Sequence, residues 1–204
     1  MTSEVPSTPD PEADAERRFG GLRRLYGNAG YARIRALRIA IVGVGGVGSW
    51  AAEALARSGV AALTLIDLDH VSESNINRQV QALGATLGQA KVLALRERIA
   101  DIHPGCAVSC VEEFADEDNW PGLLPAEVDG VIDACDQVRA KATLAAWALA
   151  SRSFRWEGFR NAGDTGNHLV GAVLMGVGGV AAMGCTVGQG LSGISTLSEP
   201  ALWR

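Results

Sequence analysis

Short apolar runs alternate with amphipathic segments along most of this 204-residue chain. Nearly continuous apolar runs are typical of parallel strands buried on both faces, and they occur at 37–42, 62–66, 107–111 and 130–134. A helical period of apolar side chains marks the segments 47–58, 89–102 and 137–151. Strands that alternate with helices predict an α/β fold, a Rossmann-like doubly wound sheet.

The N-terminal region differs from this pattern. Residues 1–16 are rich in Pro, Ser, Thr and acidic side chains, and they lack the apolar run of a signal peptide. They predict a disordered tail and a cytoplasmic protein. Residues 17–35 are basic and predict helix that is broken at Gly20–Gly21 and at Gly27.

The C-terminal region is apolar and rich in glycine. Residues 165–198 contain no charged side chain, and the run 169–185 is apolar or Gly throughout. This run is slightly shorter than the about 20 apolar residues that span a membrane. Membrane contact through 169–191, a Gly-rich segment outside any membrane and an unfolded segment all stay open. Because the composition changes after about residue 151, we expect the α/β domain to occupy 17–150.

Charge and cysteine content argue against an overall basic surface and against a zinc site built from cysteines. The net charge of −5 gives no overall basic surface for a nucleic acid, although arginines crowd the N-terminal stretch. None of the four cysteines forms a Cys-x-x-Cys pair, which argues against a zinc site built from cysteines. Free thiols fit a reducing compartment.

A glycine loop connects the first predicted strand to the first long helix. Its glycines are Gly43, Gly45, Gly46 and Gly48. Such glycines permit a tight turn and let backbone N–H groups approach a phosphate, which the N-terminus of the following helix also favours. NAD, FAD and ATP sites share this pattern, and a tight turn without ligand is the structural alternative.

Asp67 ends the second predicted strand, 24 residues after Gly43. An acidic side chain at this place accepts hydrogen bonds from ribose hydroxyls in dinucleotide sites, and it would serve ATP equally well. The alternative is that Asp67 or Asp69 caps the turn that follows.

Two cationic side chains favour ATP over NAD as the predicted ligand of the glycine loop. Arg78 and Lys91 follow the second strand, and a leaving pyrophosphate needs such positive charge, whereas nicotinamide does not. Each could instead be a solvated surface cation. With the loop and Asp67, they make ATP the predicted ligand and an NAD-dependent oxidoreductase the weaker alternative.

Asp136 follows the fourth predicted strand, at the edge of the sheet where ligands bind in such folds. A carboxylate there can hold Mg²⁺ that bridges phosphates. The alternative is an N-cap for the next helix, and both functions are compatible.

Five stretches resemble the ubiquitin-activating-enzyme-like adenylating family, the ThiF/MoeB/HesA group, over residues 17 to about 148. They are 43–49, 65–69, 74–79, 88–91 and 133–141. The resemblance implies that Asp67 holds the ribose, with Asp69 and Asn75 in the same nucleotide site. It further implies that Arg78 and Lys91 hold phosphates and that Asp136 holds Mg²⁺.

The same resemblance implies a homodimer, in which Arg24 matches an arginine that enters the neighbour's site. Within the family, residues 17–27, 43–57 and 133–141 are similar to the bacterial tRNA threonylcarbamoyladenosine dehydratase subgroup. That similarity implies ATP-dependent cyclisation, with loss of water, of a threonylcarbamoyl group on adenosine 37 of tRNA. No catalytic cysteine is needed, so Cys135 is interpreted as packing. Other members of the family suggest a cysteine desulfurase system as partner.

The resemblance to the adenylating family ends near residue 150. Residues 152–198 instead resemble a fragment of the YeeE/YedE membrane transporter family, on the stretches 171–179 and 184–193, with Cys185 in the Gly-Cys-Thr motif. A transporter needs many membrane spans, so a fragment does not transport. We therefore expect a truncated adenylating domain joined to a 151–204 fragment. An inactive ATP-binding remnant and a membrane-associated fragment related to sulfur transport remain alternatives.

Overall fold

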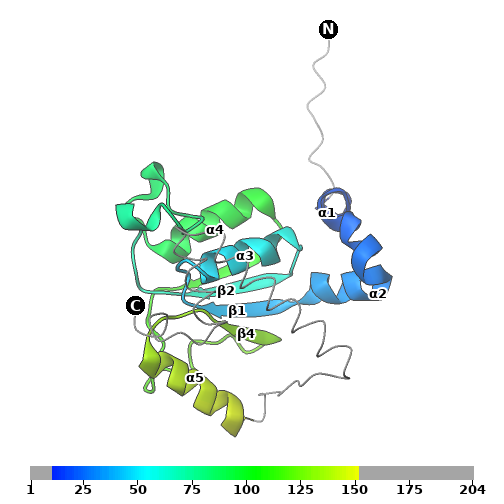
Figure 1. Cartoon of the computed structure of the whole chain (residues 1–204). Helices are drawn as coiled ribbons and strands as arrows, with labels where there is room; N and C mark the ends of the chain where they lie inside the picture. The colour runs from blue at the N-terminus through cyan, green and yellow to red at the C-terminus, as the bar shows by residue number, and fades with distance from the viewer. Residues whose placement is uncertain (1–10, 152–204) are drawn as a thin grey trace, which may run out of the picture. The chain divides into compact units, whose positions relative to one another are not determined.

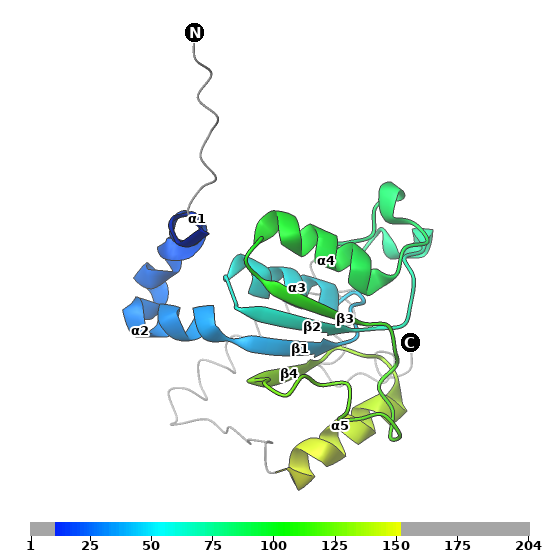
Figure 2. The ribbon, with the colours of Figure 1, turned by 180° about the vertical axis from the view of Figure 1, so that it is seen from behind.

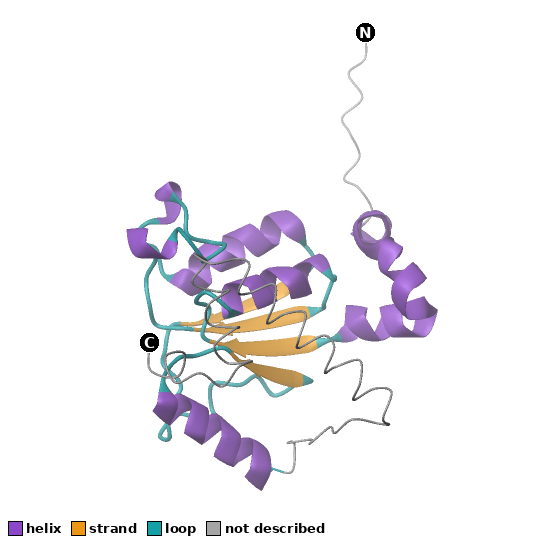
Figure 3. Cartoon of the chain, viewed as in Figure 1, coloured by secondary structure: helices purple, strands orange, loops and turns teal. Residues whose placement is uncertain are grey.

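The computed structural model describes residues 11–151, and these residues form a parallel sheet with helices on both faces. The four strands, shown in orange in Figure 3, lie in the order β3-β2-β1-β4. Their bounds are Arg38–Val42 for β1, Ala62–Ile66 for β2, Ala107–Val111 for β3 and Gly130–Asp133 for β4. Each of the four predicted strands is confirmed to within one residue at either end.

The helices α3 (Gly48–Arg57) and α4 (Lys91–Ile102) cover one face of the sheet, and α5 (Val138–Ala150) covers the other (Figures 1 and 2). The predicted α/β fold is therefore confirmed. Two short 3₁₀ turns, η2 (Glu73–Asn75) and η3 (Gly84–Thr86), interrupt the long connection from β2 to α4.

Burial on both faces explains the continuous apolar runs. In β1, Ile41 packs into the cluster beneath α3 and α4, which includes Leu95. The next residue, Val42, packs on the opposite face with Ile66 and with Leu144 of α5. Successive side chains of a strand point to opposite faces, so a strand covered on both sides is apolar at every position.

Three helical segments precede the sheet: α1 (Pro11–Phe19), the 3₁₀ turn η1 (Gly20–Leu22) and α2 (Arg23–Ala36). The predicted breaks are confirmed, because η1 begins at Gly20 and Gly27 has a φ of 68° inside α2.

The expectation of disorder over 1–16 is wrong for its last six residues, which are the first turns of α1. Asp14 accepts a hydrogen bond from Arg18 at 2.7 Å, and Glu16 pairs with Arg23 at 2.8 Å. Phe19 is buried, with its ring edge-on to His103 at a centroid distance of 4.7 Å. The partners Arg18, Arg23 and His103 all follow residue 16, so the composition of residues 1–16 does not reveal these contacts. Residues 1–10 lie outside the described part.

Several predictions fall on residues 152–204, which also lie outside the described part: the apolar segment at 169–191, its membrane contact and Cys185. Within residues 11–151, no helix is long and apolar enough to cross a membrane.

The strand order shows that the glycine loop lies where ligands bind in folds of this type. The chain moves from β1 outward to β2 and β3, then returns to the other side of β1 as β4. In open α/β sheets, ligands bind beyond the carboxyl ends of the strands at the point where the order reverses, here between β1 and β4. The loop that follows β1 lies at that point.

Candidate nucleotide site at the carboxyl edge of the sheet

Two glycines of the loop are required by the backbone itself. Gly43 has a φ of 85°, and its N–H donates to the carbonyl of Ile66 at 2.8 Å. A Cβ on Gly43 would lie 2.8 Å from the Cα of Cys135, and one on Gly48 would lie 1.8 Å from the carbonyl oxygen of Gly43. The tight-turn alternative therefore accounts for Gly43 and Gly48.

The geometry of the turn does not explain why residues 45 and 46 are glycines, because a side chain would fit at either position. A Cβ on Gly45 would meet its nearest atom, Nε2 of Gln79, at 3.9 Å. A Cβ on Gly46 would lie 3.4 Å from Cδ of Arg78. A Cβ would therefore fit at both positions, but the space is open only above Gly45, because the Arg78 side chain packs over Gly46. Gly45 lies at the N-terminus of α3, where the helix dipole favours an anion.

Asp67 ties the glycine loop to the end of β2. Its buried carboxylate accepts a hydrogen bond from the N–H of Val44 at 2.8 Å and, on the other oxygen, one from the N–H of Asp69 at 2.9 Å. The turn-capping alternative for Asp67 is thus present in the structure. Each carboxylate oxygen can accept more than one hydrogen bond, so these contacts are compatible with a ribose hydroxyl.

Lys91 is not a surface cation. Its ammonium lies 2.7 Å from Oδ2 of Asp69, and its side chain is only 8% exposed, at the first residue of α4. The backbone N–H of Lys91 also donates to the carbonyl of Asp69 at 2.9 Å. The long connection between β2 and α4 thereby closes at its two ends, next to the edge of the sheet.

Arg78 is exposed, and one terminal nitrogen of its guanidinium makes two hydrogen bonds to nearby residues of the same connection. It donates to the carbonyl of Ser74 at 2.6 Å and to Oδ1 of Asn77 at 3.0 Å. The Cδ, Cγ and Nε of Arg78 lie 3.4, 3.5 and 3.7 Å from the position that a Cβ on Gly46 would occupy, so the side chain covers Gly46. Asn75 is buried, and its Oδ1 accepts from the N–H of Ser72 at 3.0 Å, which closes the turn η2. This bond gives Asn75 a structural role, and its nucleotide contact stays a prediction.

Asp136 is exposed, and its carboxylate has no hydrogen-bond or ion-pair partner among residues 11–151. The N-cap of α5 is Gln137, which makes no side-chain cap, so the alternative of Asp136 as N-cap is wrong. Within the described residues, no three His, Cys, Asp or Glu side chains gather as a metal site. Mg²⁺ in phosphate sites takes one or two carboxylates together with phosphate oxygens, so a single free carboxylate fits it.

Asp133, the last residue of β4, accepts a hydrogen bond from Cys135 and forms an ion pair with Lys141. Its Oδ1 accepts from the Cys135 thiol at 3.0 Å, and its Oδ2 pairs with the Lys141 ammonium at 3.1 Å. Burial together with the neighbouring Asp133 carboxylate raises the pKa of the Cys135 thiol to about 11. A neutral thiol is a poor nucleophile, which agrees with the interpretation of Cys135 as packing.

Arg24 lies apart from the other predicted site residues. It is exposed on α2, which lies beyond the amino end of β1, on the side of the sheet opposite the glycine loop (Figure 2). Its side chain has no ion pair or hydrogen bond within the described part of the chain. The fold therefore does not bring Arg24 to the loop of its own chain.

Two buried glutamines accompany the loop. Gln81 donates from Nε2 to the carbonyl of Val44 at 2.9 Å, and Gln79 lies beside Gly45. Sequence reasoning missed Gln81 and assigned no role to Gln79, because polar residues in an irregular connection carry no periodic signal of burial.

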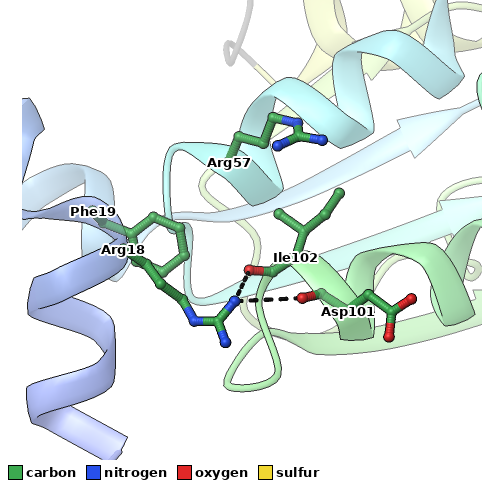
Figure 4. Close-up of a pocket in the computed structure, with 5 residues that line it drawn as sticks. All are labelled: Arg18, Phe19, Arg57, Asp101 and Ile102. Atoms are coloured by element: carbon green, nitrogen blue, oxygen red, sulfur yellow. Dashed lines mark hydrogen bonds between the residues drawn. The ribbon is translucent and has the colours of Figure 1, made fainter.

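A cavity of about 380 Å³ opens at the opposite edge of the sheet (Figure 4). It is lined by Arg18, Phe19, Arg57, Asp101 and Ile102, none of which is a predicted site residue. Figure 4 shows the Arg18 guanidinium directed at the last carbonyls of α4, at 3.1 Å from that of Ile102 and 3.4 Å from that of Asp101. Arg18 therefore caps α4, which is a structural role.

A sequence model described as the ThiF family matches residues 19–186. The match includes all the predicted site residues, and it extends past residue 150 into residues that the structure does not describe.

Two curated proteins named tRNA threonylcarbamoyladenosine dehydratase are similar to the chain. The one from Haemophilus influenzae is 46% identical over 137 residues, 67% of this chain and 52% of the relative. The one from Escherichia coli is 48% identical over 141 residues, 69% of this chain and 53% of the relative. The chain thus spans about half the length of these relatives.

The fold is also similar to a solved structure. The crystal structure of the E. coli tRNA N6-threonylcarbamoyladenosine dehydratase in complex with ATP aligns with a TM-score of 0.65 and 46% identity. The alignment covers 67% of this chain and 56% of that one. A relative that binds ATP thus has the fold described above.

Proposed function

Because the chain belongs to the ThiF family, we propose that its glycine loop binds Mg-ATP and that the bound nucleotide activates a carboxylate. The open space above Gly45 is the observation that carries this proposal. The backbone there needs no glycine for its own packing, whereas a phosphate that approaches the N–H groups does.

Each neighbouring side chain would bind a different part of the Mg-ATP. Asp67 would accept a ribose hydroxyl while it keeps the loop tied to β2. Arg78 and Lys91 would neutralise phosphate oxygens, and the buried ammonium of Lys91 interacts more strongly with an anion than a fully solvated one would. Asp136 would hold Mg²⁺, which supplies charge neutralisation between phosphates.

The reaction we propose is the cyclisation of a threonylcarbamoyl group on adenosine 37 of tRNA. The carboxylate of that group takes the adenylyl part of ATP, and pyrophosphate leaves. A nitrogen of the same group then attacks the activated carbonyl, the ring closes and AMP leaves, with net loss of water from the threonylcarbamoyl group. Support comes from relatives of this name at 46% and 48% identity.

A homodimer is part of the proposal. Arg24 is exposed on α2, which lies beyond the amino end of β1, whereas the glycine loop follows the carboxyl end of β1 (Figure 2). Arg24 would therefore act in the site of a second copy. An arginine supplied in this way adds positive charge next to the leaving phosphates. The tRNA is the proposed substrate, and a cysteine desulfurase system is the proposed partner by family resemblance.

An inactive ATP-binding remnant is the second candidate. It is favoured by one observation, that the chain spans only 52% and 53% of the two relatives. A remnant keeps the loop and its cations and lacks turnover.

Release of AMP and pyrophosphate, measured with and without threonylcarbamoylated tRNA, tests the proposal. We expect release that depends on the modified tRNA and that falls at least tenfold in Asp136→Asn. Asp118→Asn, an equal change of charge on an exposed side chain between β3 and β4, is the matched control and should match the unmodified chain. ATP binding without turnover favours the remnant, and no ATP binding contradicts both candidates.

A further inference from the structure

The side-chain amide of Gln81 has only one possible orientation. Gln81 is 1% exposed, and one end of its amide lies 2.9 Å from the carbonyl oxygen of Val44, in the glycine loop. A carbonyl oxygen only accepts, so the atom that faces it must be the amide nitrogen. Oε1 of Gln81 has no hydrogen-bond partner in the described part of the chain, so the contact with Val44 decides the orientation.

Gln81 in turn orients Gln79. The same Nε2 of Gln81 lies 3.3 Å from the amide of Gln79. Since Gln81 presents a donor there, Gln79 must present Oε1 to it, and the Nε2 of Gln79 must point the other way.

The Nε2 of Gln79 points to the open side of the glycine loop. It is the nearest atom, at 3.9 Å, to the position that a Cβ on Gly45 would occupy. Gln79 is 5% exposed, and among residues 11–151 its Nε2 has no acceptor. This nitrogen is not among the fully buried, unpartnered side-chain atoms of the described residues, which are Oε1 of Gln81 and Nε1 of Trp120. It is therefore accessible from solvent, and it can donate to an acceptor that arrives with a ligand.

We propose that Gln79 binds a phosphate oxygen of the nucleotide above Gly45 and that Gln81 is the positioning residue that presents its N–H. This inference rests on the proposed function and adds two residues to it. Phosphate oxygens only accept hydrogen bonds, and they approach the loop at the N-terminus of α3, where Gly45 leaves space.

Three substitutions in the full chain separate the possibilities. Gln79→Met keeps the length of the side chain and removes the donor. Gln79→Glu keeps the shape and the acceptor for Gln81, but it turns a negative oxygen toward the loop. Gln81→Met removes the contact that orients Gln79 and leaves Gln79 itself unchanged. Glu117→Gln, on an exposed side chain between β3 and β4, is the control for a change of one unit of charge away from the loop.

The measurement is calorimetric titration of each chain with Mg-ATP and with adenosine, which lacks the phosphates. We expect the dissociation constant for ATP to rise about tenfold in Gln79→Met, because a hydrogen bond to a charged group is lost. It should rise further in Gln79→Glu, by repulsion, and less in Gln81→Met, because the freed amide still reaches the phosphate part of the time. Adenosine affinity should stay within about twofold throughout, and Glu117→Gln should match the unmodified chain.

Three results decide the outcome. Unchanged ATP affinity in both Gln79 variants overturns the inference and leaves the proposed function standing. An equal loss of ATP and adenosine affinity also overturns it, because the glutamine would then only support the loop. If the unmodified chain binds no ATP, the proposed function fails, and the inference fails with it.

Discussion

The Nζ of Lys91 lies 2.7 Å from Oδ2 of Asp69, and the two ends of this ion pair are unequally exposed: 8% for the lysine side chain and 54% for the aspartate. The ammonium therefore depends on its partner for solvation, whereas the carboxylate is largely solvated by water. A charge that is buried is costly without a partner, and an exposed one is not.

This inequality predicts opposite effects of the two single substitutions. Lys91→Met should weaken Mg-ATP binding at least tenfold and change the free energy of unfolding little, because Asp69 remains solvated. Asp69→Asn should lower the free energy of unfolding by about 1–3 kcal/mol, because the buried ammonium loses its countercharge. Urea denaturation with and without Mg-ATP measures both. A stable Asp69→Asn chain beside an unfolded Lys91→Met chain would contradict this account of the pair.

The four glycines of the loop should separate into two classes. Gly48→Ala places a Cβ 1.8 Å from the carbonyl oxygen of Gly43, so we expect a loss of about 3 kcal/mol or more in the free energy of unfolding. Gly45→Ala meets nothing closer than 3.9 Å, so its stability should stay within about 0.5 kcal/mol of the unmodified chain. Its ATP affinity should nevertheless fall at least tenfold, because the methyl group occupies the phosphate position. Unchanged ATP affinity in Gly45→Ala would show that the space above the loop is not the nucleotide site.

The regular part of the fold could be predicted from the sequence, because burial on both faces leaves a direct signal. Strands such as β1 are apolar at every position, and the glycine loop identifies where β1 ends. The composition of residues 1–16 does not reveal the helix α1, because the arginine partners of Asp14 and Glu16 follow residue 16, although the spacing of Asp14 and Arg18 is itself a local helical pattern. The orientation of Gln79 depends on Gln81 and Val44, which meet only in the folded chain. Contacts of this kind have no local pattern.

The Cys135 thiol should be unreactive near neutral pH. Burial and the Asp133 carboxylate raise its pKa to about 11, and burial raises that of Cys106 to about 11 as well. Alkylation by iodoacetamide at pH 8 should therefore be slower than that of a free thiol in an unfolded chain. Cys135→Ser should keep ATP turnover, because no step of the proposed reaction uses the thiol. Fast alkylation of Cys135 together with loss of turnover would contradict the packing role.

The same pKa values determine how stability depends on pH. A thiol whose pKa is higher in the folded state than in the unfolded state binds its proton more tightly when folded. Its contribution to stability is fully present below the unfolded pKa near 9, and it is lost as the pH rises from about 9 to about 11. Cys135→Ser should therefore flatten the fall in the unfolding temperature over this range.

Arg24 and Lys91 should belong to different copies in each working site. Arg24→Ala and Lys91→Met chains should each be inactive alone. In an equal mixture that has exchanged subunits, half of the dimers are mixed, and each mixed dimer has one intact site. Turnover should then return to roughly a quarter of that of the unmodified protein, as expected for a symmetric dimer. Normal turnover in Arg24→Ala alone, or no recovery in a mixture shown to contain mixed dimers, would contradict the action of Arg24 on a second copy.

Equilibrium binding of Mg-ATP to the full chain, with NAD⁺ as competitor, tests the nucleotide assignment most directly. The loop, Asp67 and the cations Arg78 and Lys91 predict saturable binding of one ATP per chain, with no displacement by NAD⁺ at concentrations that saturate ordinary dinucleotide sites. Binding of NAD⁺ in preference to ATP, or the absence of saturable ATP binding, would contradict the account.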